Sequence, residues 1–331
     1  MGEVVGEVVV VTGASGGVGR AVAVRFAREG AAVGLVARGQ AGLEGAAREV
    51  EKAGGTALVL PCDVASADEV EAAAAQVESA LGPIDVWVNN AMVAVYAPVW
   101  DLSVDEFRRA TDVTYFGAVW GTMAALRRMR PRDRGVIVQV GSALAYRAIP
   151  LQSAYCGAKF AERGFTDAVR TELIHERSRV RITSVHLPAV NTPQFSWGRT
   201  KLARHPRPVA PVFQPEVMAG AIWWAAHHER RELFATFRAA LTITGSKFAP
   251  GALDHLLGRT GFEGQQLAEP VAPDRPDNLH APADDERDLG AHGRFDAESK
   301  SRSLQLELAT RRPLAGAFSR PLGALLARLL S

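Results

Sequence analysis

Cysteine is scarce in this sequence, and no group of side chains has the spacing of a metal site. The 331 residues include only two cysteines, Cys62 and Cys156, which do not suggest a disulfide framework. His227 and His228 are adjacent and would point to different faces of a helix. We therefore expect no disulfide and no metal. Cys156 is interpreted as a small buried residue, with a reactive thiol as the alternative.

Long apolar runs and a strong charge of either sign are also missing. No uninterrupted stretch of about 18 apolar residues occurs, which argues against a membrane-spanning helix. The formal net charge is only +2, so bulk electrostatics gives no case for nucleic-acid binding. The first residues are strand-like, without the basic region and apolar core of a signal peptide. By default we expect a cytoplasmic protein.

Short apolar runs instead alternate with amphipathic stretches from Glu7 to about Thr244. The sequence predicts strands at Glu7–Val11, Ala32–Val36, Ala57–Leu60, Ile84–Val88, Gly135–Val140, Arg181–His186 and Glu232–Thr236. It predicts helices at Val18–Arg28, Ala41–Lys52, Ala67–Leu81, Val104–Arg130, Ser153–Ile174 and Pro215–Ala226. This alternation predicts an α/β fold, a Rossmann-type doubly wound parallel sheet with helices on both faces.

A glycine-rich turn lies between the first predicted strand and the first predicted helix. It contains Gly13, Gly17 and Gly19. A strand, a glycine turn and a helix in this order let the pyrophosphate of a dinucleotide reach the helix N-terminus. The pattern alone would be weak in a chain with 31 glycines, so the prediction of a dinucleotide site depends on this context.

Tyr155 and Lys159 are four residues apart in a predicted helix, in a chain with only four tyrosines. That spacing places both side chains on one face. Lowering a tyrosine pKa from about 10 to near 7 requires roughly 4 kcal/mol. A positive charge about 4 Å away supplies about that much at an effective dielectric near 20. Tyr155 could then act as acid or base toward an alcohol or carbonyl oxygen, which Ser142 at the end of a strand would hold.

These motifs together resemble the short-chain dehydrogenase/reductase family, in its single-domain branch. The resemblance rests on Thr12 to Gly19, Ser142, Tyr155 and Lys159, and it covers about three quarters of the chain. It implies hydride transfer to or from a nicotinamide, with Tyr155 moving the proton and Lys159 also binding the nicotinamide ribose. The residues that it implies for cofactor binding are Gly13, Ser15, Gly17, Val18, Gly19, Asp63, Val64, Asn89, Ala91, Tyr155, Lys159 and Thr192.

The sequence departs from the family pattern in two places. Thr114 occupies the position where an asparagine usually helps to hold a water beside the catalytic lysine. We include Thr114 among the candidate catalytic residues, although a hydroxyl puts that proton relay in doubt. Leu187 and Pro188 replace a Pro-Gly pair ahead of Thr192. The backbone path before Thr192 is therefore expected to differ.

The end of the second predicted strand bears on the choice of cofactor. Family members that prefer NAD usually have an acidic residue there, which binds the ribose hydroxyls. This chain has Ala37 followed by Arg38. A guanidinium can form a forked hydrogen bond to a 2′-phosphate, which a carboxylate would repel. Arg38 therefore favours NADP(H), with NAD(H) as the second choice; a solvated loop arginine is the alternative interpretation.

The chain continues beyond the segment that resembles the family. We divide it into a catalytic domain at residues 1–250 and a C-terminal extension at 251–331, partly irregular. Leu267–Lys300 is rich in Pro, Asp and Glu, and is predicted to be poorly packed and to lie over the surface. Pro313–Leu330 is predicted to be an amphipathic helix. That tail could pack on its own protein, on another subunit, or peripherally on a membrane.

The resulting prediction is an NADP(H)-dependent oxidoreductase that interconverts a hydrophobic secondary alcohol and its ketone. Phe195 and Trp197 lie in an irregular stretch where family members carry a mobile substrate lid, and they suit a small apolar substrate. We expect a homodimer or homotetramer. The alternative is an NADP-binding regulatory or scaffold protein of the same fold that has lost turnover.

Overall fold

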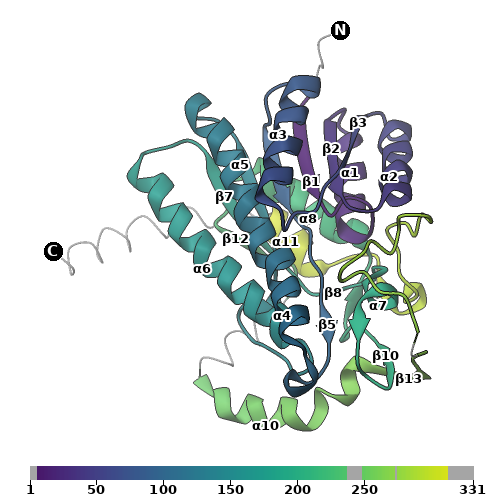
Figure 1. The fold of residues 1–331 in the computed structure, drawn as a ribbon. Helices are drawn as coiled ribbons and strands as arrows, with labels where there is room; N and C mark the ends of the chain where they lie inside the picture. Colours follow the sequence, from purple (N-terminus) through teal and green to yellow (C-terminus); the bar gives the residue numbers. More distant parts are fainter. Residues whose placement is uncertain (1–5, 237–247, 273, 312–331) are drawn as a thin grey trace, which may run out of the picture.

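The structure, a computed structural model, describes residues 6–236, 248–272 and 274–311. Its centre is a seven-stranded parallel sheet in the order β12-β7-β6-β4-β1-β2-β3 (Figure 1). The strands are β1 (Val8–Thr12), β2 (Ala32–Ala37), β3 (Thr56–Pro61), β4 (Val86–Asn89), β6 (Val136–Ser142), β7 (Arg181–Leu187) and β12 (Glu232–Phe234). The chain reverses its direction of winding between β1 and β4, where a doubly wound sheet opens a crevice for ligands.

Helices cover both faces of the sheet. One layer consists of α1 (Gly17–Ala27), α2 (Gln40–Lys52) and α8 (Pro215–His227). The other consists of α3 (Ala67–Leu81), α4 (Val104–Thr111), α5 (Gly117–Arg132) and α6 (Ser153–His175). Because both faces are covered, the strands are apolar at successive positions; Val9, Val10 and Val11 of β1 are all fully buried. The predicted doubly wound fold is confirmed.

One predicted helix is interrupted in the structure. The stretch predicted as a single helix, Val104–Arg130, comprises α4, a π-helical turn at Asp112–Phe116, and α5. The start of α4 is fixed by a capping box between Ser103 and Glu106. A π-turn inserts an extra residue into the helical repeat, and such turns are frequent at functional sites. Helical periodicity in the sequence does not reveal this insertion.

Short elements gather beyond the carboxyl ends of the strands. They include a four-residue helix, α7 (Gln194–Trp197), within the stretch predicted as a substrate lid. The paired short strands are β5 (Val95–Tyr96) with β9 (Arg199–Thr200), β10 (Arg204–Pro206) with β13 (Gln266–Pro270), and β8 (Ala189–Val190) and β14 (Ser299–Lys300) on either side of β11 (Val212–Phe213). The last two groups tie the extension to the core of the fold.

The extension packs more closely than the sequence predicts. It begins with α10 (Pro250–Thr260), which has no buried residue, and its described part ends with α11 (Leu304–Arg311). Between them, Leu279 and Phe295 are buried. The expectation of a poorly packed Leu267–Lys300 segment was therefore wrong, because apolar anchors spaced among polar residues hold it on the core. The predicted tail helix, Pro313–Leu330, lies outside the described residues.

No helix within the described part of the chain has both the length and the apolar character to cross a membrane.

Candidate active site

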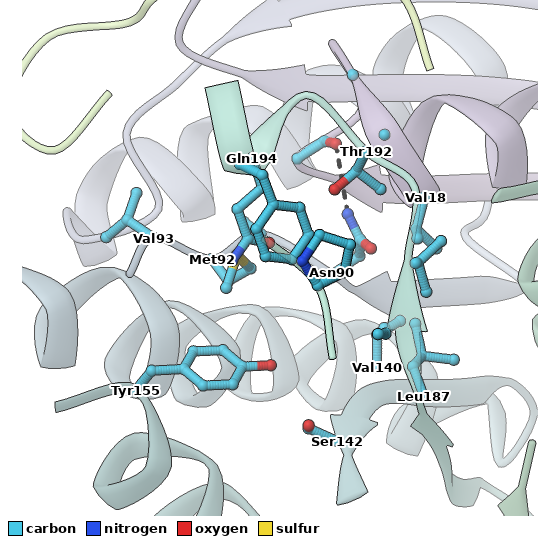
Figure 2. A pocket seen from close by; sticks show the side chains of 18 of the residues that line it. Val18, Asn90, Met92, Val93, Val140, Ser142, Tyr155, Leu187, Thr192 and Gln194 are labelled. Carbon is cyan, nitrogen blue, oxygen red and sulfur yellow. Dashed lines mark hydrogen bonds between the residues drawn. The ribbon is translucent and has the colours of Figure 1, made fainter. Parts of the chain in front are cut away.

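A cavity of about 550 Å³ opens at the carboxyl ends of β1, β4 and β6 (Figure 2). Its lining contains most of the residues that the sequence singles out. They are Gly13, Ser15, Gly17, Val18, Arg38, Asp63, Val64, Ala91, Ser142, Tyr155, Lys159 and Thr192. These residues come from positions 13 to 192, so the fold brings the predicted glycine turn and the predicted catalytic residues into one site.

The glycine turn passes close to the turn after β4. Gly13 and Gly17 have φ angles of +69° and +56°, which side-chain-bearing residues rarely adopt. A Cβ on Gly13 would lie 2.9 Å from the Cα of Ala91, and one on Gly17 would lie 3.1 Å from the Cγ2 of Thr192. Helix α1 begins at Gly17 without a side-chain cap. Its Gly17 amide donates to the Gly290 carbonyl oxygen at 3.3 Å, so the narrow glycine cradle and the amides that follow Gly17 are left to fit the pyrophosphate of a dinucleotide.

Three predicted site residues do not line the cavity. Gly19 lies behind the turn, where a Cβ would overlap the Gly13 carbonyl oxygen. Asn89 is buried, accepts from Trp87 Nε1 at 2.8 Å and donates to Thr122 Oγ1 at 3.0 Å. It therefore holds β4 against α5 rather than facing a cofactor. The third is Thr114, in the π-turn.

Thr114 is locked to the segment that follows β4. Its hydroxyl donates to the Val93 carbonyl oxygen at 3.0 Å and accepts from the Val93 amide at 3.2 Å, and the residue is fully buried. The donor hydrogen of the hydroxyl is therefore used on the Val93 carbonyl oxygen and is not available to a water beside Lys159. The structure thus gives Thr114 a positioning role, because Val93 lines the cavity.

Ser142 and Tyr155 face each other across the cavity (Figure 2). Ser142 ends β6, and its Oγ accepts from the Leu144 amide at 3.1 Å, which fixes the side chain. Tyr155 comes from the first turn of α6, and its hydroxyl points toward Ser142 (Figure 2). Burial raises the pKa of Tyr155 well above its ordinary value, against the opposing effect of the nearby Ser142 hydroxyl. A protonated phenol and a hydroxyl therefore converge where a carbonyl oxygen would bind.

Lys159 is paired differently from the sequence prediction. Its Nζ lies 2.6 Å from Glu162 Oε2 and donates to the Val140 carbonyl oxygen at 2.8 Å, while the centre of the Tyr155 ring is 6.0 Å away. Both members of the ion pair are buried. The carboxylate offsets the ammonium charge, and Glu162 also acts to raise the pKa of Tyr155. The sequence prediction considered only the approach of Lys159 to the phenol and did not include this ion pair with Glu162.

The part of the cavity beyond Tyr155 is mainly apolar. Phe195 of the predicted lid lines it, together with Met92 and Leu144. Trp197 is also in the lining, but its ring lies at the glycine turn, where a Cβ on Gly16 would be 2.9 Å from its Cη2. Leu187 and Pro188, the residues that replace the family's Pro-Gly pair, are also in the lining, so that departure reaches the site itself.

Arg38 is in the lining at the opposite end, but its guanidinium is already engaged. It donates to the backbone carbonyls of Asn278, Leu279 and His280 in the extension. Burial and the nearby Arg109 lower the pKa of Arg38. Asp63, the residue expected at the adenine, is ion-paired with Arg109 at 2.5 Å. Burial acts to raise the pKa of Asp63, but the bond to Arg109, the bond from the Ala65 amide and the charges of Arg109 and Arg38 together lower it.

Several lining residues were not anticipated from the sequence. Asn90 takes the place expected for Asn89, because it is the first residue beyond the end of β4. Tyr96 and Gln194 are joined by a hydrogen bond of 2.8 Å across the substrate end. Asn278 and Asp284 come from the extension. The position of Asn90 just after the last residue of β4 could have identified it from the sequence. No local signal connects Asp284 with β2, which ends more than two hundred residues earlier.

Comparisons with known proteins agree with this geometry. The family model described as short chain dehydrogenase matches residues 7–201. The oxidoreductase YxnA of Bacillus subtilis is 31% identical over 94% of this chain and 87% of its own length. A fatty acyl-CoA reductase of Acinetobacter baylyi is 31% identical over 78% of this chain and 84% of its own.

A solved structure shares the fold as well. The alcohol dehydrogenase of Thermococcus sibiricus, complexed with 5-hydroxy-NADP, superposes with a TM-score of 0.60 and 28% identity. The match covers 69% of this chain and 95% of that one.

Proposed function

This chain belongs to the short-chain dehydrogenase/reductase family, and on that premise we propose that it interconverts a hydrophobic secondary alcohol and its ketone. As a member of the family it is an oxidoreductase with a nicotinamide cofactor. The observation that carries the finer proposal is the convergence of the Tyr155 and Ser142 hydroxyls in a cavity that is apolar on the substrate side.

The proton chemistry follows from these two side chains. In the direction of ketone reduction, Tyr155 donates its proton to the carbonyl oxygen while Ser142 donates a hydrogen bond to the same atom. The chemistry that a bound nicotinamide supplies is hydride transfer to or from the substrate carbon. In alcohol oxidation Tyr155 acts as the base, which its raised pKa makes harder at neutral pH.

The glycine cradle and Lys159 supply the cofactor site in this proposal. The amides that follow Gly17 at the start of α1 would bind the pyrophosphate. Lys159, held between Glu162 and the Val140 carbonyl, would bind the nicotinamide ribose with its remaining N–H. NADP(H), the cofactor predicted from the sequence, is supported by Arg38 in the lining and by the relative solved with 5-hydroxy-NADP. The argument against NADP(H) is that Arg38 already donates hydrogen bonds to three backbone carbonyl groups.

An apolar substrate is supported by two independent features. The lining residues Phe195, Met92 and Leu144 can bury hydrocarbon surface of a substrate, which contributes about 25 cal/mol per Å². A relative of similar length is named as a fatty acyl-CoA reductase, an enzyme of a long apolar chain. We propose aliphatic or aromatic ketones and the corresponding alcohols as the substrate class.

One observation favours a second candidate, a cofactor-binding protein without turnover. Glu162 offsets the charge of Lys159 and raises the pKa of Tyr155, which weakens Tyr155 as a base. Both candidates require cofactor binding, and only the first requires turnover.

The test is a screen of hydrophobic ketones and secondary alcohols with the purified full-length chain, in which the absorbance of reduced nicotinamide is followed. Binding of the reduced cofactor is measured in parallel by fluorescence. Turnover of any ketone in the panel supports the oxidoreductase proposal. Tight cofactor binding with no turnover across the panel and across pH would instead establish the second candidate.

A further inference from the structure

The C-terminal segment 274–293, called here the cover segment, forms a wall of the cavity at the Arg38 end. It contributes Asn278, Pro282, Ala283 and Asp284 to the lining. Figure 1 shows it as the yellow-green loop beside α1 and α2. The glycine turn also contacts it, since the Gly17 amide donates to the Gly290 carbonyl oxygen at 3.3 Å. The cofactor site is therefore built from both ends of the chain.

Three arginines of the core hold the cover segment in place. Arg38 donates to the His280 carbonyl oxygen at 2.9 Å, and Arg109 donates to the Leu279 carbonyl oxygen at 3.0 Å. Arg20 is buried and ion-paired with Asp288. Arg38 thus binds backbone carbonyl groups of the cover segment with its guanidinium. Those N–H groups are the ones that an arginine would need for binding a 2′-phosphate at this place.

The N-terminus of α2 fixes the position of Asp284. The Gly42 amide donates to the Asp284 carbonyl oxygen at 2.9 Å, and the Ala41 amide donates to the Asp285 carbonyl oxygen at 3.1 Å. The Asp284 side chain then enters a cradle between Gly39 and Gly42, where a Cβ on either glycine would overlap the carboxylate. The same cradle borders Ser15, which lines the cavity.

The Asp284 carboxylate is buried without a full set of partners. The residue is only 5% exposed, and its Oδ2 has no hydrogen-bond partner among the described residues. Asn278 Oδ1, in the same lining, is likewise buried and without a partner there. An unsatisfied buried acceptor is costly, and both residues belong to the cavity lining, so a ligand that brings hydrogen-bond donors to them would relieve that cost.

We propose that Asp284 binds the adenosine ribose hydroxyls and makes NAD(H) the preferred cofactor. The proposal rests on the proposed nicotinamide-dependent function. A ribose with free 2′- and 3′-hydroxyls offers two donors, and a carboxylate accepts both. A 2′-phosphate replaces one donor with up to two negative charges beside a buried carboxylate, which repels it. Asp284 thus supplies the acidic group that is absent at Ala37, where β2 ends.

The test compares the dissociation constants of NADH and NADPH for wild type, Asp284→Asn and Glu286→Gln. Hydrogen bonds to a charged group correspond to about a tenfold or larger change in affinity. We expect wild type to bind NADH at least about tenfold more tightly than NADPH, and Asp284→Asn to reduce that ratio about tenfold. Glu286→Gln removes a charge from an exposed position of the same segment and should leave the ratio unchanged.

A second measurement isolates the subsite from the rest of the site and needs no variant. Displacement of NADH by 5′-ADP should be at least about tenfold more effective than displacement by 2′,5′-ADP. Tighter binding of NADPH or 2′,5′-ADP by wild type would overturn the role of Asp284 while leaving the oxidoreductase proposal intact. An Asp284→Asn ratio within about threefold of wild type would do the same. Failure of both dinucleotides to bind would overturn the proposed function itself.

Discussion

The two ends of the cavity are built from different parts of the chain. At the catalytic end, Ser142 and Tyr155 come from β6 and α6, elements of the central fold. At the adenosine end, the wall comes from the cover segment, with Asp284 in the lining. In our proposals, the proton chemistry therefore depends on β6 and α6, and the choice of cofactor depends on the cover segment. Each can therefore be changed by substitution without the other.

The largest expected effect is at the catalytic end. Tyr155→Phe removes the transferable proton and leaves the ring, so turnover should fall about 100- to 10,000-fold while the cofactor dissociation constant stays the same. Tyr115→Phe is the matched control, because Tyr115 does not line the cavity. If the Tyr155→Phe enzyme retained more than about a tenth of the wild-type rate, Tyr155 would not be the proton donor.

Arg38→Gln tests whether the other end is organised by the cover segment. Loss of the guanidinium releases the three carbonyl acceptors at residues 278–280. Both NADH and NADPH should then bind less tightly by the same factor, about tenfold, and proteolysis within residues 274–293 should accelerate. Arg28→Gln, at an exposed position after α1, is the control. A selective loss of NADPH affinity would show instead that Arg38 reads a 2′-phosphate.

The same division explains what could be predicted from the sequence. Strands such as β1 and helices such as α3 are specified locally, by apolar runs and by a cap such as Ser66, so their positions were predicted within two residues. Tyr155 and Ser142 were found because their chemistry depends on spacing along such elements. The role proposed for Asp284 depends on a contact with Gly39 and Gly42, which are far away in the sequence. The hydrophobic periodicity of the sequence carries no information about such a contact.

Lys159 illustrates the same limit within the catalytic end. The four-residue spacing from Tyr155 was correctly interpreted as one helical face. The partner that matters electrostatically, Glu162, is only three residues beyond Lys159 on the same helix. The sequence permits both pairings, and only the burial of Lys159 and Glu162 together shows that the ion pair forms.

Glu162→Gln measures how strongly that pair controls the catalytic tyrosine. The Glu162 charge acts to raise the pKa of Tyr155, so its removal lowers that pKa. Alcohol oxidation needs the phenolate, so the oxidation rate should begin to rise at a lower pH in this variant than in wild type. Glutamine keeps an oxygen acceptor for Lys159. Glu172→Gln, at an exposed position of α6, is the control. A rise that begins at the same pH or at a higher pH contradicts the assignment.

The smallest expected effect separates positioning from chemistry at Thr114. Thr114→Val keeps the shape but removes the hydroxyl that bonds the Val93 amide and carbonyl. The free energy of unfolding should fall by about 1–3 kcal/mol, because the partners stay buried and unpaired. Thr111→Val, which loses a hydrogen bond at a partly exposed position one turn earlier, should cost less. Turnover at saturating cofactor should stay within about threefold of wild type, since general acid–base catalysis is worth far more. A much larger loss of rate in a fully folded Thr114→Val enzyme would show that the Thr114 hydroxyl takes part in proton transfer.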